Sequence, residues 1–144
     1  MAVDLGRSMR ELIEDGERSF SFEFFPPKDE AGERQLWQAI TDLEPYRPTF
    51  VSVTYGAGGS SRDTTIRITE RIAHDTSLVP VAHLTCVGHT RSELVSILEE
   101  YEAAGVHHVL ALRGDPADGP RAEWTPVADG FSYASELVEL VAAR

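Results

Sequence analysis

The sequence predicts an α/β fold of alternating strands and helices, and three observations predict it. Short runs rich in aromatic and β-branched residues alternate with longer segments whose apolar residues recur at helical spacing. This alternation repeats along 144 residues, which is the length of one ordinary domain. Strands that are joined by helices in this rhythm run parallel. The unusual polar residues fall where predicted strands end, at the edge where α/β enzymes keep their chemistry.

The first half of the chain predicts the order helix, strand, helix, strand. A charged segment with two adjacent apolar residues predicts the first helix, and a run of phenylalanines stopped by Pro26 and Pro27 predicts the first strand. Leucine, isoleucine and tryptophan at helical spacing predict the second helix, which Pro45 ends. A run with two valines predicts the second strand. These elements are expected at Met9–Glu17, Ser19–Phe25, Glu30–Glu44 and Phe50–Thr54.

The second half continues the same alternation. A glycine-rich loop at 56–59 precedes a helix with isoleucines at helical spacing, and an apolar strand follows. The next helix carries leucines, isoleucine and tyrosine on one face and is stopped by Gly105. A fourth strand, a loop with three prolines and a last helix complete the chain. These elements are expected at Asp63–His74, Val79–Thr85, Ser92–Ala104, His108–Leu112 and Tyr133–Ala143.

Four such units fit either an open doubly wound sheet or half of an eight-stranded barrel. No glycine fingerprint of the dinucleotide-binding type follows the first strand. Polar residues lie at the C-terminal ends of the predicted strands, where barrel enzymes place their active sites. These residues are Glu23, Thr54, His83, Arg113 and Asp115. We therefore favour the (β/α)8 TIM barrel family, with the chain covering about four β/α units, a half-barrel within one domain over residues 1–144.

Composition narrows the classes of partner. The formal net charge of −11 argues against nucleic acid and against an anionic membrane surface. No apolar run approaches the roughly 20 residues of a membrane span, and the N-terminal residues lack the pattern of a secretion signal. The single cysteine, Cys86, fits a reducing, cytoplasmic setting. His83 and Cys86 alone are too few ligands for a metal, so no metal site is expected.

One carboxylate, Glu23, lies within a strand that is otherwise mostly aromatic. Strand alternation places it with Ser21 and Phe25 on one face, toward the interior of a barrel, and the remaining phenylalanines toward the helices. Burial there would raise the pKa of Glu23, as a general acid working near neutral pH requires. The same sequence pattern would arise if Glu23 instead faced solvent from an edge strand.

Four segments at the predicted strand ends, taken in order, resemble methylenetetrahydrofolate reductases. Each alone is weak, because a glycine loop, a strand histidine and an Arg-Gly-Asp turn are common in unrelated proteins. Their joint order is specific, and the resemblance runs from about Ser19 to the last helix. The segments are Phe22–Pro27, Val53–Gly59, Ala82–Cys86 and Arg113–Pro116, with Tyr133 and Ala134 beyond them.

The resemblance implies a barrel that carries FAD and reduces 5,10-methylenetetrahydrofolate to 5-methyltetrahydrofolate with NADH or NADPH. It implies that Glu23 is the acid that protonates the folate nitrogen. It places Asp115 near the pyrimidine end of the flavin and the folate, as a second catalytic residue. It implies a homo-oligomer for the full-length enzyme. The residues expected to line the flavin are Thr54, Tyr55, Ala57, His83, Arg113, Gly114, Asp115, Tyr133 and Ala134.

The chain departs from the family in length, because a closed barrel needs eight strands and this sequence predicts four. It is expected to be the N-terminal half of the enzyme, and a half-barrel with open edges is expected to associate or to be unstable alone. Two alternatives stay open. One is direct transfer of hydride from the nicotinamide to the folate without flavin, and the other is a non-catalytic fragment that only binds a partner or ligand.

Overall fold

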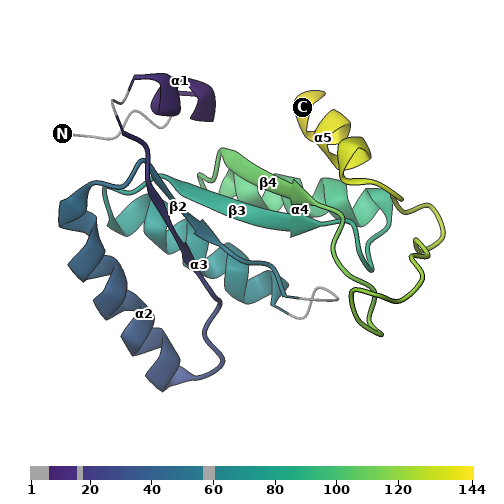
Figure 1. Ribbon diagram of the computed structural model, residues 1–144, viewed down its shortest axis with the longest axis horizontal. Helices are drawn as coiled ribbons and strands as arrows, with labels where there is room; N and C mark the ends of the chain where they lie inside the picture. Colours follow the sequence, from purple (N-terminus) through teal and green to yellow (C-terminus); the bar gives the residue numbers. More distant parts are fainter. Residues whose placement is uncertain (1–6, 16–17, 57–60) are drawn as a thin grey trace.

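The structure, a computed structural model, describes residues 7–15, 18–56 and 61–144. Helices and strands alternate along the described chain, as the sequence predicts (Figure 1). The elements are α1 (Met9–Glu14), β1 (Ser21–Phe24), α2 (Glu30–Leu43), the short 3-10 helix η1 (Glu44–Tyr46), β2 (Phe50–Val53), α3 (Arg62–Asp75), β3 (Pro80–Thr85), α4 (Arg91–Ala103), β4 (His108–Leu112) and α5 (Ala134–Ala142).

The strands form one parallel sheet in the sequential order β1-β2-β3-β4. The pairing register places Glu23 beside Ser52, Ser52 beside Val81 and Val81 beside His108, so these residues share one face. A doubly wound sheet reverses its strand order at a switch point. The described strands show no reversal, so the doubly wound alternative is wrong for this part of the chain.

The helices cover the opposite face of the sheet. Leu36 and Ile40 of α2 pack with Ile68 of α3 against Val51 and Val53 of β2. A second cluster joins α4 and α5 to β3 and β4; it includes Leu94, Ile97, Leu98, Leu137, Ala82 and Leu84. Figure 1 shows α3 and α4 behind the sheet. Apolar burial therefore stabilises one side of the sheet and leaves the other side available for a ligand or further chain.

Most predicted boundaries agree with the structure to within a residue or two. The strand His108–Leu112 is confirmed to the residue, and α2 begins at Glu30 because Oδ1 of Asp29 caps it by accepting a 2.7 Å hydrogen bond from the Gly32 amide. The first strand is shorter than predicted, because its pairing with β2 spans only Ser21–Phe24.

The aromatic face of β1 is only partly as predicted. Phe22 and Phe24 pack on the helix side, which confirms the assignment from strand alternation. Phe20 was expected to pack there as well and does not. It lies before the strand, is 45% exposed and contacts the Phe22 ring edge-on at 5.9 Å between centroids.

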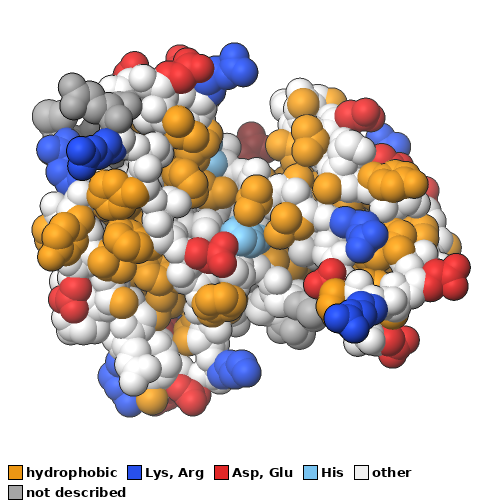
Figure 2. All heavy atoms as spheres, in the orientation of Figure 1, with side chains coloured by type: hydrophobic (Ala, Val, Ile, Leu, Met, Phe, Trp, Pro, Cys, Tyr) orange, Lys and Arg blue, Asp and Glu red, His pale blue; other side chains and the backbone are white. Residues whose placement is uncertain are grey.

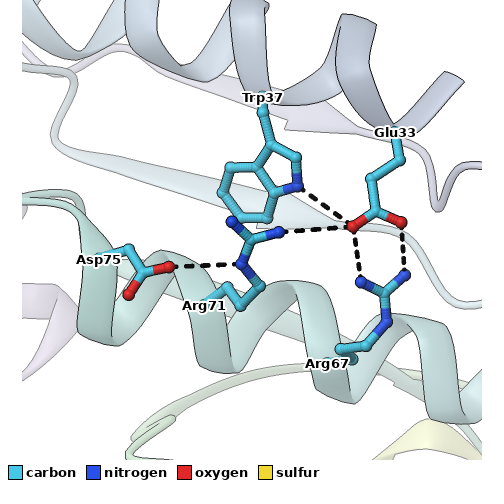
Figure 3. A network of polar contacts seen from close by, with 5 residues as sticks. All are labelled: Glu33, Trp37, Arg67, Arg71 and Asp75. Atoms are coloured by element: carbon cyan, nitrogen blue, oxygen red, sulfur yellow. Dashed lines mark hydrogen bonds and ion pairs between the residues drawn. The ribbon is translucent and has the colours of Figure 1, made fainter. Parts of the chain in front are cut away.

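A polar network on the helix layer joins α2 to α3 (Figure 3). Glu33 accepts two hydrogen bonds from the Arg67 guanidinium, at 2.6 and 2.8 Å, while the Arg71 guanidinium lies 3.9 Å from the centre of the Trp37 ring. The hydrogen bond from Arg67 is the main cause that lowers the pKa of Glu33 to about 2. A groove lined by Trp37, Arg71 and neighbouring side chains also lies here, away from the strand ends.

This network predicts a defined loss of stability in acid. The folded chain holds Glu33 ionised to a lower pH than the unfolded chain does, so its contribution is present above the unfolded pKa of about 4.5 and is lost as pH falls toward 2. Urea unfolding at pH 7, 4 and 2.5 should show Glu33→Gln less stable than the parent at pH 7, with the difference shrinking in acid. Glu30→Gln, on the same helix but almost fully exposed, is the control and should match the parent throughout. A constant difference for Glu33→Gln would contradict the assignment.

Candidate active site

Glu23 and His83 meet on the sheet face that the helices leave uncovered. Oε2 of Glu23 lies 3.4 Å from Nε2 of His83. The residues come from β1 and β3, and the side chains approach over β2, where the register places the small side chain of Ser52 beside Glu23. Figure 2 shows an acidic side chain and a histidine side by side near the centre of this face, among hydrophobic side chains. Parallel register therefore joins two of the predicted site residues.

His83 is a buried histidine on the open face of the sheet. Its residue is 6% exposed, and Nε2 has no hydrogen-bond partner among the residues that the structure describes. The distance from Nε2 of His83 to Oε2 of Glu23 is short enough for an ion pair. The relative orientation of the two groups, however, does not form a hydrogen bond. Burial lowers the pKa of His83, and the Glu23 charge offsets this only in part. The imidazole is therefore neutral near pH 7, and its nitrogen is free to contact a ligand.

The expected burial of Glu23 is wrong for this chain. Its side chain is 51% exposed, because it points to the open face while the phenylalanines on either side, Phe22 and Phe24, point toward the helices. The four phenylalanines nearby in the sequence thus do not enclose the carboxylate. Within the part of the chain that the structure describes, the burial that the general-acid role was predicted to need is absent.

Hydrogen bonds hold the backbone of Thr54, the residue after β2, on both sides. The Thr54 amide donates to the Phe24 carbonyl at 2.9 Å, and the Thr54 carbonyl accepts from Oγ1 of Thr65 at 3.0 Å. The Tyr55 side chain turns into the core beneath the sheet, where burial raises its pKa to about 12. Tyr55 can therefore reach a ligand on the open face only through its backbone. Ala57, which was expected to line the flavin, lies outside the described residues.

The end of β4 lies against the end of β3. The Cys86 amide donates to the Leu112 carbonyl and the Val87 amide to the Arg113 carbonyl, each at 3.0 Å, so the ladder continues past both strands. Gly114 follows with φ of +82°, and an added Cβ would lie 2.6 Å from Cγ1 of Val87. This position requires glycine.

The other predicted residues of this region lie at the surface. The exposed Arg113 guanidinium lies 4.8 Å from the centre of the Trp124 ring, and Asp115 is exposed. Tyr133 caps α5, Ala134 opens it, and the Tyr133 carbonyl accepts a contact of 3.7 Å from Sγ of Cys86. The structure thus brings Tyr133 to the end of β3.

Two polar residues on the open face were not predicted as site residues. Oγ1 of Thr85 and Nε2 of His108 are buried and, within the described ranges, have no hydrogen-bond partner. The pairing register places both on the face of His83. Strand alternation from His83 could have found Thr85, because residues two apart in a strand share a face.

The described residues contain neither a metal-binding cluster nor a helix that could cross a membrane. Over residues 7–15, 18–56 and 61–144, no group of three or more His, Cys, Asp or Glu side chains is placed to hold a metal ion. None of the helices in these ranges has the length and apolar character to cross a membrane.

Comparison with known proteins gives one family. The family model described as methylenetetrahydrofolate reductase matches residues 8–144. The chain is 41% identical over 138 residues to 5,10-methylenetetrahydrofolate reductase of Escherichia coli, and 38% identical over 136 residues to methylenetetrahydrofolate reductase (NADH) 1 of Arabidopsis thaliana. These alignments cover 95% and 94% of this chain, but 43% and 23% of the two relatives. The chain therefore spans less than half the length of the relatives that it matches.

Proposed function

The chain belongs to the methylenetetrahydrofolate reductase family, and we propose that it forms the first four β/α units of that enzyme's (β/α)8 barrel. The sequential parallel sheet with helices on one face supports this, since a barrel is such a sheet continued until it closes. The 43% coverage of the bacterial relative is consistent with half of one barrel domain.

The reaction we propose is reduction of 5,10-methylenetetrahydrofolate to 5-methyltetrahydrofolate. The open sheet face at the strand ends would hold the folate and the nicotinamide, NADH or NADPH. The observation that carries the proposal is the Glu23–His83 pair at 3.4 Å, on the face where later strands would enclose a lumen. A carboxylate beside a neutral imidazole, whose Nε2 has no hydrogen-bond partner among the described residues, supplies a proton-transfer group and a hydrogen-bonding group at one place.

FAD is the cofactor that the family resemblance implies, and the residues present fit it. His83 and Thr85 offer buried polar atoms without a protein partner in the described chain, and a flavin ring carries matching donors and acceptors along its edge. Bound there, the flavin would take hydride from the nicotinamide and pass it to the folate. The residues proposed to hold it are Thr54, the Tyr55 backbone, Ala57, His83, Arg113, Gly114, Asp115, Tyr133 and Ala134.

Glu23 would supply the proton in this scheme. Protonation of the folate nitrogen opens the five-membered ring and leaves the methylene carbon as an electrophile. The carboxyl group must then hold its proton near neutral pH, which requires removal from water. Further strands that close the barrel would cover the open face and provide that burial.

The proposed function is tested by two half-reactions of the purified enzyme under anaerobic conditions. NADH or NADPH should bleach the flavin absorbance, and methylenetetrahydrofolate should restore it while 5-methyltetrahydrofolate forms. An enzyme that makes the product with no flavin absorbance would instead support direct hydride transfer.

Asp115 gives a second measurable consequence. A carboxylate near the flavin's pyrimidine ring disfavours the anionic reduced form, because like charges repel. Asp115→Asn should therefore raise the midpoint potential of the bound flavin and weaken folate binding. Asp118→Asn, in the same exposed loop, is the matched control and should leave the potential unchanged. Equal potentials for Asp115→Asn and the parent enzyme would remove Asp115 from the neighbourhood of the flavin.

A further inference from the structure

His89 lies in the loop between β3 and α4, just after Ala82–Cys86, one of the segments that carry the family resemblance. Its ring is buried, and Nε2 lies 3.1 Å from the hydroxyl of Tyr55, which follows β2. The two rings meet edge-on, with centroids 5.8 Å apart. This contact joins the loop after β2 to the loop after β3.

The backbone around His89 reaches a third segment. Its amide donates to the Cys86 carbonyl at 3.2 Å, which closes a tight turn at the end of β3. The next residue, Thr90, forms an antiparallel bridge with Gly130, and the Arg91 amide donates to the Asp129 carbonyl at 2.9 Å. His89 is therefore also attached to the long segment between β4 and α5.

Gly130 shows how close this third attachment is. A Cβ added at Gly130 would lie 2.8 Å from the His89 carbonyl oxygen and 2.8 Å from Cγ2 of Val127. Real side chains do not tolerate such distances, so the segment can lie against His89 only with glycine there. The following residues lead directly to Tyr133.

The side-chain contact between Tyr55 and His89 joins two neutral groups. Burial lowers the pKa of His89; the charge of Glu93 opposes this shift and that of Arg62 adds to it. Burial also raises the pKa of Tyr55 to about 12. Near pH 7 a neutral imidazole therefore meets a protonated phenol, and either tautomer allows one hydrogen bond.

We infer that His89 is a positioning residue that joins the loops after β2, β3 and β4 and so fixes the backbone of Thr54 and Tyr55 relative to Tyr133. Its consequence for cofactor binding rests on the proposed function, since these loops carry residues proposed to hold the flavin. The attachment itself is a property of the chain without any ligand. Tyr55 would then serve the site through its buried hydroxyl as well as its backbone.

Amide hydrogen exchange, measured on the protein without bound flavin, tests the attachment in three variants. His89→Leu removes the polar atom, Tyr55→Phe removes the hydroxyl, and His89→Gln keeps a group that can donate or accept. Exchange over residues 54–56 and 127–131 should rise at least fivefold in the first two variants and stay within twofold in His89→Gln. The helix α3 serves as the internal control. If amide exchange in His89→Gln were as fast as in His89→Leu, only the packing of the ring would matter. That result would overturn the inference.

A double variant separates this contact from general loosening. His89→Leu combined with Tyr55→Phe should exchange no faster than either single variant, because both remove the same hydrogen bond. Additive effects would also overturn the inference. In the flavin-binding enzyme, His89→Leu should raise the FAD dissociation constant at least tenfold and His89→Gln less than threefold. A parent enzyme that binds no FAD would reject the proposed cofactor, while the exchange result would still decide the role of His89.

Discussion

Glu23→Gln is expected to abolish reduction of the folate while leaving reduction of the flavin by NADH or NADPH nearly intact. Glutamine keeps the size and shape of the side chain but cannot supply a proton. Only the folate half-reaction needs that proton, because ring opening requires protonation of the folate nitrogen. General acid catalysis is typically worth a factor of about 10² to 10⁴ in rate, so the loss should be at least of that order.

The two half-reactions, followed by stopped-flow absorbance of the flavin, provide the comparison. Flavin reduction is the internal control for correct folding, and Glu30→Gln is a control for removal of one exposed carboxylate. Equal loss in both half-reactions would assign Glu23 a structural role. Unchanged folate reduction would remove it from the reaction altogether.

Gly114→Ala is expected to be the most destabilising conservative change at the strand ends. Its φ of +82° disfavours any side chain by about 1–2 kcal/mol. The new Cβ would also lie 2.6 Å from Cγ1 of Val87 and 3.0 Å from Cβ of Thr85. Overpacking of this kind typically costs a further 1–3 kcal/mol or so. The end of β4 and the adjacent end of β3, which carries Thr85, would then shift together.

Gly119→Ala separates the two causes. Gly119 also has positive φ, +104°, but an added Cβ there meets nothing within 4 Å. In urea unfolding, Gly119→Ala should lower the free energy of unfolding only by the cost of its positive φ. Gly114→Ala should lower it by roughly 1–3 kcal/mol more. Equal losses would mean that Val87 moves aside at no cost, and that close packing does not fix the end of β4.

The positions of the strand ends were predictable because local signals define them. Prolines stop the first strand, and Gly114, which has a positive φ, follows the fourth. The alternation of residues in β1 correctly separated Glu23 from Phe22 and Phe24. It failed at Phe20, because alternation applies only within a strand, and pairing begins at Ser21.

The site was harder to predict because its contacts join separate strands. Nothing in the sequence near Glu23 indicates His83, since their approach depends on the register of β1, β2 and β3 and on the small Ser52 between them. Tyr55 lies in a segment typical of the family, yet its ring turns into the core. The direction of a side chain just after a strand depends on the packing of the neighbouring loop.

The sequence by itself determined the parallel α/β order, the family and the polar residues at the strand ends, because period, turn residues and motifs are local properties of the chain. Only the tertiary structure decided which of those residues meet and how exposed they are. It paired Glu23 with a neutral His83, left that carboxylate half-exposed, and attached His89 to the loops after β2 and β4. Burial and strand register depend on residues that are distant in the chain, so no local sequence pattern specifies them.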